Sequence, residues 1–456
     1  MLRLRAVAAL LALCLVAAGA GWSGATTADS APGPAGTTSA PATVATDDAA
    51  FDGSVDETID AVQDYWADTF PEIYGSTYDP IPDDRLFPYS ESSPPPGCGT
   101  SGDTPYEEVA GNAFYCPAFP GGGGDFVAWD TQELFPQLER EHGPFAVALV
   151  LAHEWGHAVQ ARADLQASTL FMEQQADCFA GSWARSVADG DTDLSLGSDD
   201  LDTALSGFLQ FRDPPGVDPS QEGAHGNAFD RVRAFQDGFE GSASSCRDYE
   251  SDPPSVTESG YDSQVDAAND GDLPFAEILE ALEPALDAYW QDAAGSDAAV
   301  ADVAAGSPSS CDSGSDHGVL TDDVVYCGTD DRIVYREDAL VAAYEDAGDF
   351  GVGMLLAAAW SSAAQHALDR PVGTDDAHLE ADCLTGAWTG AVYHGDLPRT
   401  IELSLSPGDL DEAVLVFVTF EGRGVTTAFE RVRAFRTGFD GGADACLATS
   451  GDRPGV

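Results

Sequence analysis

Two histidines and a glutamate in the segment HEWGH have the types and spacing needed to hold and use a metal ion. His153 and His157 are four residues apart, so on a helix both imidazoles project from one face and can reach a single zinc ion. Glu154 lies beside them, where a carboxylate can take a proton from the attacking water and later deliver it to a leaving amine. These residues predict one Zn2+ per chain and hydrolysis of a peptide or protein substrate.

The helix that this spacing requires is expected over residues 144–162. Pro144 suits the first turn of a helix, and residues 145–152 are apolar on all sides, which is typical of a buried helix. Gly156 stands between the two histidines at a cost in helix stability. We expect a neighbouring backbone or the substrate to approach closely there.

A second helix is expected over residues 171–188, and it carries Glu173 and Asp177 four residues apart. We predict that Glu173 is the third zinc ligand. Asp177 is expected to hydrogen-bond one of the ligand histidines and so to orient it.

The region around HEWGH recurs later in the chain. Without a gap, Trp155 matches Trp360 and Gln160 matches Gln365. Near the end of each copy the motif RVRAF is repeated, which predicts a shared helix whose arginines pair with acidic neighbours. Such internal similarity indicates two related units.

The second copy lacks the proposed zinc ligands. In order, the residues His153, Glu154, His157, Glu173 and Asp177 correspond to Ala358, Ala359, Ser362, His378 and Asp382. Because the aspartate persists where no metal can bind, it is better interpreted as a supporting residue than as a ligand. We therefore expect one zinc site, in the first copy, and a catalytically dead second copy with a structural or regulatory role.

His225 also has no counterpart, because the aligned stretch of the second copy reads EGRGVTTAF. Its loss together with the ligands favours a role in the active site, such as stabilising a tetrahedral oxyanion. A solvent-exposed loop histidine is the alternative.

Composition divides the chain into five regions. They are a signal peptide (1–25), an Ala, Thr, Ser and Pro-rich disordered stalk (26–50), the zinc-site unit (51–250), a linker (251–270) and the degenerate repeat (271–450). Arg3 and Arg5 followed by a short apolar run are typical of a secretory signal. Secretion to the medium or the exterior of the cell envelope is expected, with retention of the run as an anchor as the alternative, and no later segment is suited to span a membrane.

Cleavage of the signal removes Cys14 and leaves eight cysteines, an even number that argues for disulfides in an exported chain. Symmetry between the copies favours the pairs Cys98–Cys116, Cys178–Cys246, Cys311–Cys327 and Cys383–Cys446, although other pairings fit the sequence too. Ligation of metal by Cys178 is a weaker alternative, since Cys383 persists where the ligands are lost.

The chain of 456 residues carries 79 acidic and 19 basic residues, a formal charge of −60. Such a surface repels phosphate backbones, so nucleic acid is excluded as an expected partner. Asp189, Asp191 and Asp193 alternate as in a calcium loop, but no glycine follows at the sixth position. A solvated loop is the favoured interpretation there.

The expected fold is predominantly helical α+β, with a small hairpin or edge strands (114–116 and 126–129) ahead of the metal-binding helix, and two such units packed together.

Three separated motifs resemble those of the bacterial neutral zinc metallopeptidase family, of gluzincin type: AHEWGHAVQ, EQQADCFAGSWA and HGNAFDRVRAFQDGF. The resemblance spans most of residues 51–250. It implies zinc held by His153, His157 and Glu173, with Glu154 as the catalytic carboxylate. A non-catalytic partner-binding protein with a structural zinc, or a zinc amidase acting on a non-peptide amide, is the alternative.

Overall fold

The computed structural model describes residues 53–448 except 100–101, 121–122, 222–223, 258–259, 262, 296–297, 299, 301, 312–319, 402 and 420–425. The predicted signal peptide (1–25) and stalk (26–50) lie outside the described residues.

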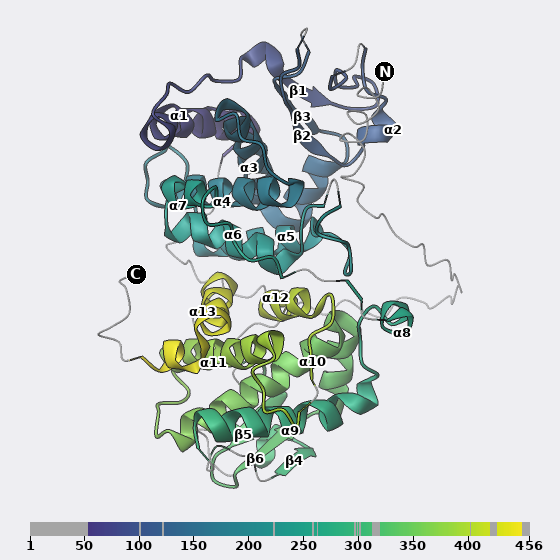
Figure 1. Cartoon of the computed structure of the whole chain (residues 1–456), viewed down its shortest axis with the longest axis vertical. Coiled ribbons are helices and arrows are strands. Elements are labelled where there is room, and N and C mark those ends of the chain that lie inside the picture. The colour runs from purple at the N-terminus through teal and green to yellow at the C-terminus, as the bar shows by residue number, and fades with distance from the viewer. Residues whose placement is uncertain are drawn as a thin grey trace, which may run out of the picture.

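The described chain forms two lobes, each with one small sheet and a set of helices, and the two sheets lie at opposite ends of the molecule (Figure 1). The fold is predominantly helical α+β, as expected from the sequence. The first lobe contains α1 (Val55–Tyr74), η2 (Asp83–Arg85), β1 (Leu86–Tyr89), α2 (Tyr106–Val109), β2 (Ala113–Cys116), β3 (Phe126–Asp130), α3 (Leu134–Arg162), α4 (Thr169–Ala188), α5 (Ser198–Gln210), α6 (Ala228–Glu240) and α7 (Ala243–Asp248).

The second lobe follows a short helix, α8 (Gln264–Ala268), which lies within the stretch expected to be a linker. It contains α9 (Phe275–Ala293), β4 (Asp302–Ala305), η4 (Pro308–Ser310), β5 (Val324–Cys327), β6 (Arg332–Tyr335), α10 (Glu337–Ala367), α11 (Asp375–His394), α12 (Asp409–Thr419) and α13 (Ala428–Leu447).

Each sheet has three strands in the same arrangement. The orders are β1-β3-β2 and β4-β6-β5, with one parallel and one antiparallel pair in each. The two strands expected from the sequence, β2 and β3, do pair antiparallel. However, of these two strands only β2 lies at an edge, because β3 is the central strand of its sheet.

The helix expected over residues 144–162 is the second part of α3. The chain departs from helical geometry at Gly143, whose φ is 75°, a left-handed value that glycine adopts without a steric cost. Pro144 then begins the new segment in the position that favours proline. Its apolar side chains are buried, as the sequence pattern indicates. The helix α10 has the same kind of break, at Gly348 with φ 70°.

Glycines allow the central helices of each lobe to touch. A Cβ at Gly156 would lie 2.8 Å from the Cα of Ala176, so α3 and α4 cross in backbone contact. A Cβ at Gly181 would lie 2.0 Å from the carbonyl oxygen of Phe235, which brings α4 against α6. In the second lobe Gly386 makes the same approach to the carbonyl oxygen of Phe435, at 1.9 Å.

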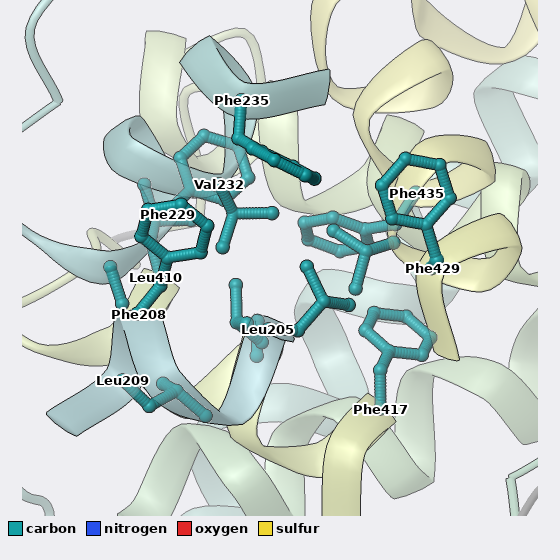
Figure 2. Packing of buried hydrophobic residues seen from close by; sticks show 14 of the residues in the cluster. Leu205, Phe208, Leu209, Phe229, Val232, Phe235, Leu410, Phe417, Phe429 and Phe435 are labelled. Carbon is teal, nitrogen blue, oxygen red and sulfur yellow. The ribbon is translucent and has the colours of Figure 1, made fainter. Parts of the chain in front are cut away.

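The lobes meet through a continuous apolar core built by α5 and α6 on one side and α12 and α13 on the other (Figure 2). Its aromatic contacts are reciprocal. The ring of Phe229 lies 6.2 Å from that of Phe435, and the ring of Phe235 lies 6.2 Å from that of Phe429. A two-fold related pair of surfaces produces this kind of exchange of partners.

Four disulfides join Cys98 to Cys116, Cys178 to Cys246, Cys311 to Cys327 and Cys383 to Cys446. These are the pairs that symmetry favours, and they leave Cys178 without a thiolate for a metal ion. Such bonds are compatible with an extracellular location. Among the helices of the described residues, none has the length and apolar character needed to cross a bilayer.

Candidate metal centre

Three of the residues singled out in the sequence come together where α3 crosses α4. His153 and His157 project from α3, and Glu173 projects from the first turns of α4. The Nε2 atom of His153 lies 3.3 Å from one carboxylate oxygen of Glu173, and that of His157 lies 3.4 Å from the other. The absence of a side chain at Gly156 lets the two helices approach closely enough for this.

Each histidine is oriented through its other ring nitrogen. The Nδ1 atom of His153 lies 2.7 Å from Oδ1 of Asp177, and the Nδ1 atom of His157 lies 2.9 Å from Oε1 of Gln160. A carboxylate or amide oxygen at Nδ1 keeps the proton on that nitrogen. Both Nε2 lone pairs are then left to face Glu173.

Asp177 is itself held by an arginine. Nε and Nη2 of Arg231, on α6, donate to Oδ2 and Oδ1 of Asp177 at 2.8 and 3.0 Å. The aspartate is fully buried, so this two-point contact compensates for its lost hydration. The pairing confirms the expectation that arginines of the repeated RVRAF motif have acidic partners. Arg431 makes the same contact with Asp382 in the second lobe.

Glu154 lies beside the histidines and is 8% exposed. Its Oε2 atom accepts a hydrogen bond from the backbone N–H of Tyr115, on the edge strand β2, at 2.7 Å. Burial raises the pKa of this carboxyl, while the two histidines and the Tyr115 N–H act to lower it, and the net direction is upward. A raised pKa suits a carboxylate that must accept a proton and then give it away.

The site favours a positive charge between its ligands. Burial alone lowers the pKa of His153, but Asp177 and Glu173 overcome this effect and raise it to about 10. Burial alone raises the pKa of Glu173, but the charges of His157, His153 and His225 hold it well below its usual range.

His225 reaches the neighbourhood of this cluster from the loop before α6. Its Nδ1 atom lies 3.6 Å from a carboxylate oxygen of Asp213. The other oxygen of Asp213 accepts the backbone N–H groups of His225 and Gly226 at 2.7 and 2.8 Å. The loop that carries His225 is therefore fixed by one partly buried carboxylate.

The matching positions of the second lobe do not form such a cluster. Ala358, Ala359 and Ser362 are buried, and the Ser362 hydroxyl donates to its own helix at the carbonyl of Ala358. Within the described part of the chain, the only groupings of three or more His, Cys, Asp or Glu suited to a metal are His153, His157 and Glu173, and a set of carboxylates elsewhere.

Several supporting residues could not be assigned from the sequence. Gln160 was visible as a repeated residue, since Gln365 matches it, but not as the partner of His157. Its amide nitrogen donates to the carbonyl of Met172 at 2.7 Å, which fixes the amide oxygen toward the histidine. The Tyr115 N–H and Asp213 carry no sequence signal, because both act through contacts between distant segments.

The three residues fit a zinc ion. Nitrogen and oxygen ligands at about 2.0–2.1 Å from a tetrahedral zinc stand roughly 3.3 Å apart, close to the 3.3 and 3.4 Å separations seen here. In addition, Oε2 of Glu173 is buried and accepts no hydrogen bond from any described residue. A buried carboxylate oxygen without a donor needs another positive partner.

Comparison with known proteins agrees with this chemistry. An uncharacterized protein of Escherichia coli K12, YpfJ, is 27% identical over 203 residues, which are 39% of this chain and 64% of that protein. An uncharacterized protein of Mycobacterium tuberculosis H37Rv, Rv2575, is 40% identical over 103 residues, 19% of this chain and 31% of that protein. The chain thus covers less than two thirds of either relative. No solved structure matches it. The profile of the family described as "Putative neutral zinc metallopeptidase" matches residues 6–249, more than half of the chain, and the chain belongs to that family.

Proposed function

We propose that the chain is a secreted zinc metallopeptidase that hydrolyses peptide bonds. In this proposal His153, His157 and Glu173 hold the zinc ion, and Glu154 acts as general base and acid. The observation that carries this proposal is the arrangement of two Nε2 atoms and one carboxylate around a single point, with a further carboxylate beside them. One zinc ion per chain is expected.

The number of ligands favours catalysis over a bracing role. Structural zinc sites in proteins are closed by four protein ligands, whereas catalytic sites have three and leave a position open. Only three candidate ligands meet here among the described residues. A bracing site would also have no use for the buried carboxylate of Glu154.

The protein residues have distinct tasks in the proposed reaction. When bound, zinc polarises the scissile carbonyl and lowers the pKa of the attacking water. The Tyr115 N–H holds Oε2 of Glu154, which leaves Oε1 to take the proton of that water and to carry it to the leaving amine. His225, held near the cluster by Asp213, is proposed to donate a hydrogen bond to the oxyanion as it forms.

The second lobe is proposed to be a degenerate copy of the first. The shared strand order, the helix breaks at Gly143 and Gly348 and the paired arginines support a duplication. The boundaries proposed from the sequence, 51–250 and 271–450, leave 251–270 as the connection. In the second lobe the positions that correspond to the zinc ligands and Glu154 hold Ala358, Ala359, Ser362 and His378. The proposed role of this lobe is therefore structural or regulatory.

Secretion is proposed from the N-terminal sequence, and the four disulfides support it, because such bonds persist in oxidising compartments. A protein purified from the medium and beginning after Ala20 or Ala25 is the expected outcome of signal cleavage. A chain found only with its first residues intact and attached to the cell envelope would contradict this part of the proposal.

The decisive experiment combines metal analysis with one substitution. The folded chain, prepared with zinc present, should hold one zinc ion and cleave members of a broad peptide library. Glu154→Gln should keep the zinc but lose roughly a hundredfold to ten-thousandfold in rate. The control is Glu139→Gln, an exposed glutamate of α3, which should change neither.

Three outcomes would contradict the proposal. Two zinc ions or none would overturn the ligand assignment. Equal activity of the Glu154→Gln and wild-type chains, or no peptide cleavage by either, would favour a structural zinc. Cleavage of non-peptide amides alone would make the chain an amidase.

A further inference from the structure

A second cluster of ligand-type side chains lies in the second lobe, and it contains only carboxylates. Asp272 precedes α9, Asp349 follows the break in α10, and Glu412 lies in the first turn of α12. One carboxylate oxygen of each residue lies within 4.8 Å of an oxygen of both others. The cluster thus joins three segments that are far apart in the sequence.

Asp349 is the most enclosed member of the cluster, at 9% exposure. Its Oδ2 atom accepts the backbone N–H of Leu273 at 2.7 Å. Its Oδ1 atom is buried and accepts no hydrogen bond from any described residue. Leaving a buried acceptor unpaired costs about 1–3 kcal/mol, and more for a charged group, so an additional partner is expected at this oxygen.

Glu412 is built into the break of α10. Its Oε2 atom accepts the backbone N–H groups of Phe350 and Gly351 at 2.8 and 3.3 Å. A Cβ at Gly348 would lie 2.2 Å from Oε1 of the same carboxylate, so the lack of a side chain there makes room for it. The break in α10 therefore provides both the backbone N–H donors and the space that the Glu412 carboxylate occupies.

The cluster has no cation to balance it among the described residues. None of the three carboxylates pairs with an arginine or histidine of that part of the chain, and the buried Asp409 adds a further acidic neighbour. Burial and the charge of Asp272 raise the pKa of Asp349 to about 6, against the lowering effect of the Leu273 N–H. A bound cation would remove this repulsion.

We propose that Asp272, Asp349 and Glu412 bind a calcium ion. Carboxylate oxygens are hard ligands that suit calcium or magnesium, whereas zinc prefers the nitrogen-rich set on α3 and α4. Calcium accepts six to eight oxygens in irregular geometry, including water and backbone carbonyls, while magnesium demands a near-ideal octahedron. Asp272 and Glu412 are only partly buried, which leaves room for water to complete the shell.

The ion would fix the helix that docks onto the first lobe. Asp411, next to Glu412, accepts the backbone N–H of Phe229 at 3.1 Å and pairs with Nε of Arg212 at 3.1 Å. Phe229 lies in the first turn of α6, the helix whose Arg231 holds Asp177. Calcium bound at the start of α12 would therefore stabilise the contact between the lobes.

The test is a titration of calcium chloride into the full mature chain, with zinc supplied at a constant level after removal of other divalent ions. Calorimetry should show one saturable site, and the melting temperature should rise with occupancy. Asp349→Asn and Glu412→Gln should each lose the site and the rise. Asp191→Asn, in the exposed acidic loop after α4, is the matched control and should keep both.

The variants also report on their own folding. Asn and Gln remove the like-charge repulsion but can still accept the backbone hydrogen bonds, so without calcium both should melt at or above the wild-type temperature. If either fails to fold, Asp272→Asn replaces it, because Asp272 is only partly buried and an amide oxygen there can still accept the backbone N–H of Asp349.

Diffuse binding without saturation in the wild type, or an equal rise in the cluster variants, would overturn the site. An equal rise with magnesium at the same concentration would overturn the assignment to calcium. None of these results depends on peptidase activity, so they stand apart from the fate of the proposed function.

Discussion

At the scale of single residues, an aspartate–arginine contact of the same geometry occurs once in each lobe, and only the first of the two lies beside the candidate metal centre. Asp177 and Arg231 lie behind a histidine of the candidate metal centre. Asp382 and Arg431 make the same contact where no ligand cluster is present. Comparing the two contacts therefore separates the contribution of the aspartate to folding stability from its contribution to the candidate metal centre.

Asp177→Asn should weaken zinc binding by about 10–100-fold, because the amide is a poorer partner for the Nδ1–H of His153. Both Asp177→Asn and Asp382→Asn should lose stability on the order of 3 kcal/mol, since each leaves a buried arginine without its counter-charge. Competition with a chelator measures the zinc affinity, and urea unfolding measures the stability. A matching loss of zinc affinity in Asp382→Asn would contradict the assigned role.

The spacing of residues along a helix made much of the candidate site predictable. His153 and His157 were singled out because helical geometry places residues four apart on one face. Glu173 was proposed from a second helix, where it stands four residues before Asp177. The role of Gln160 was not found, because it depends on which way an amide is turned, and that is set by Met172 on another helix. His225 was singled out because the aligned stretch of the second lobe has no histidine there.

At the scale of elements, the helices that carry the site are held at backbone contact by glycine. Gly181 on α4 faces Phe235, and Gly238 on α6 faces the carbonyl of Cys178, where a Cβ would lie at 1.8 Å. Two glycines on facing helices thus bring α4 and α6 together. This closeness is what lets Arg231 reach across to Asp177.

Gly181→Ala should cost about 1–3 kcal/mol or more, because the new Cβ forces α4 away from α6 and no nearby side chain can yield. Gly207→Ala on α5, where a Cβ would meet nothing within 4 Å, should instead gain about 0.5–1 kcal/mol from helix propensity. Chemical unfolding of the two variants beside the wild type provides the measurement. Stabilisation by both would show that the helices are not in the contact described.

Local signals explain which elements were foreseen. Pro144 and the apolar run after it mark the start of the helical segment that carries His153 and His157, but the preceding helical segment from Leu134 is not predicted because Gly143 interrupts the pattern. The parallel pairing of β1 with β3 had no local signal, since the strands are joined by a long excursion. A parallel pair needs such a crossover, and its register is set by tertiary packing.

At the scale of the whole molecule, the two lobes share one apolar core. Phe229 lies 5.0 Å from Phe439 and Phe239 lies 5.2 Å from Phe429, again with partners exchanged. Hydrogen bonds follow the same plan: Asp202 of α5 accepts the backbone N–H groups of Ala428 and Phe429, as Asp411 accepts that of Phe229.

We expect the described part of the chain to unfold as one unit. Phe235→Ala and Phe429→Ala should each cost about 3–5 kcal/mol and should act on both lobes, because their rings touch across the interface. Calorimetry should show a single transition that moves down in either variant. Two separate transitions, only one of them shifted, would contradict a shared core.

Asp411 gives this interface a dependence on pH. Burial raises its pKa to about 6, although Arg212 and the Phe229 N–H act to lower it. A folded-state pKa above the ordinary value of 3.8 means that the folded chain binds more protons. The contribution of Asp411 to stability should therefore fall as pH rises from about 4 to 6, by on the order of 3 kcal/mol.

Asp411→Asn should remove that part of the slope of unfolding free energy against pH. Measurements at several pH values between 4 and 6 would detect it, with Asp191→Asn as a control at an exposed carboxylate. An unchanged slope in Asp411→Asn would mean that the carboxyl is not held in the environment described.

The exchange of partners among the phenylalanines also bears on how selection acts on the chain. A substitution at Phe429 or Phe435 disturbs the first lobe directly, so these positions are expected to be retained even though the described residues of their own lobe lack a histidine and glutamate cluster like that of the first lobe. No such contact with a described residue across the interface constrains positions 358, 359 and 362, so we expect substitution among small residues there. Among relatives that carry both lobes, we expect the interface phenylalanines to be retained and those three positions to vary.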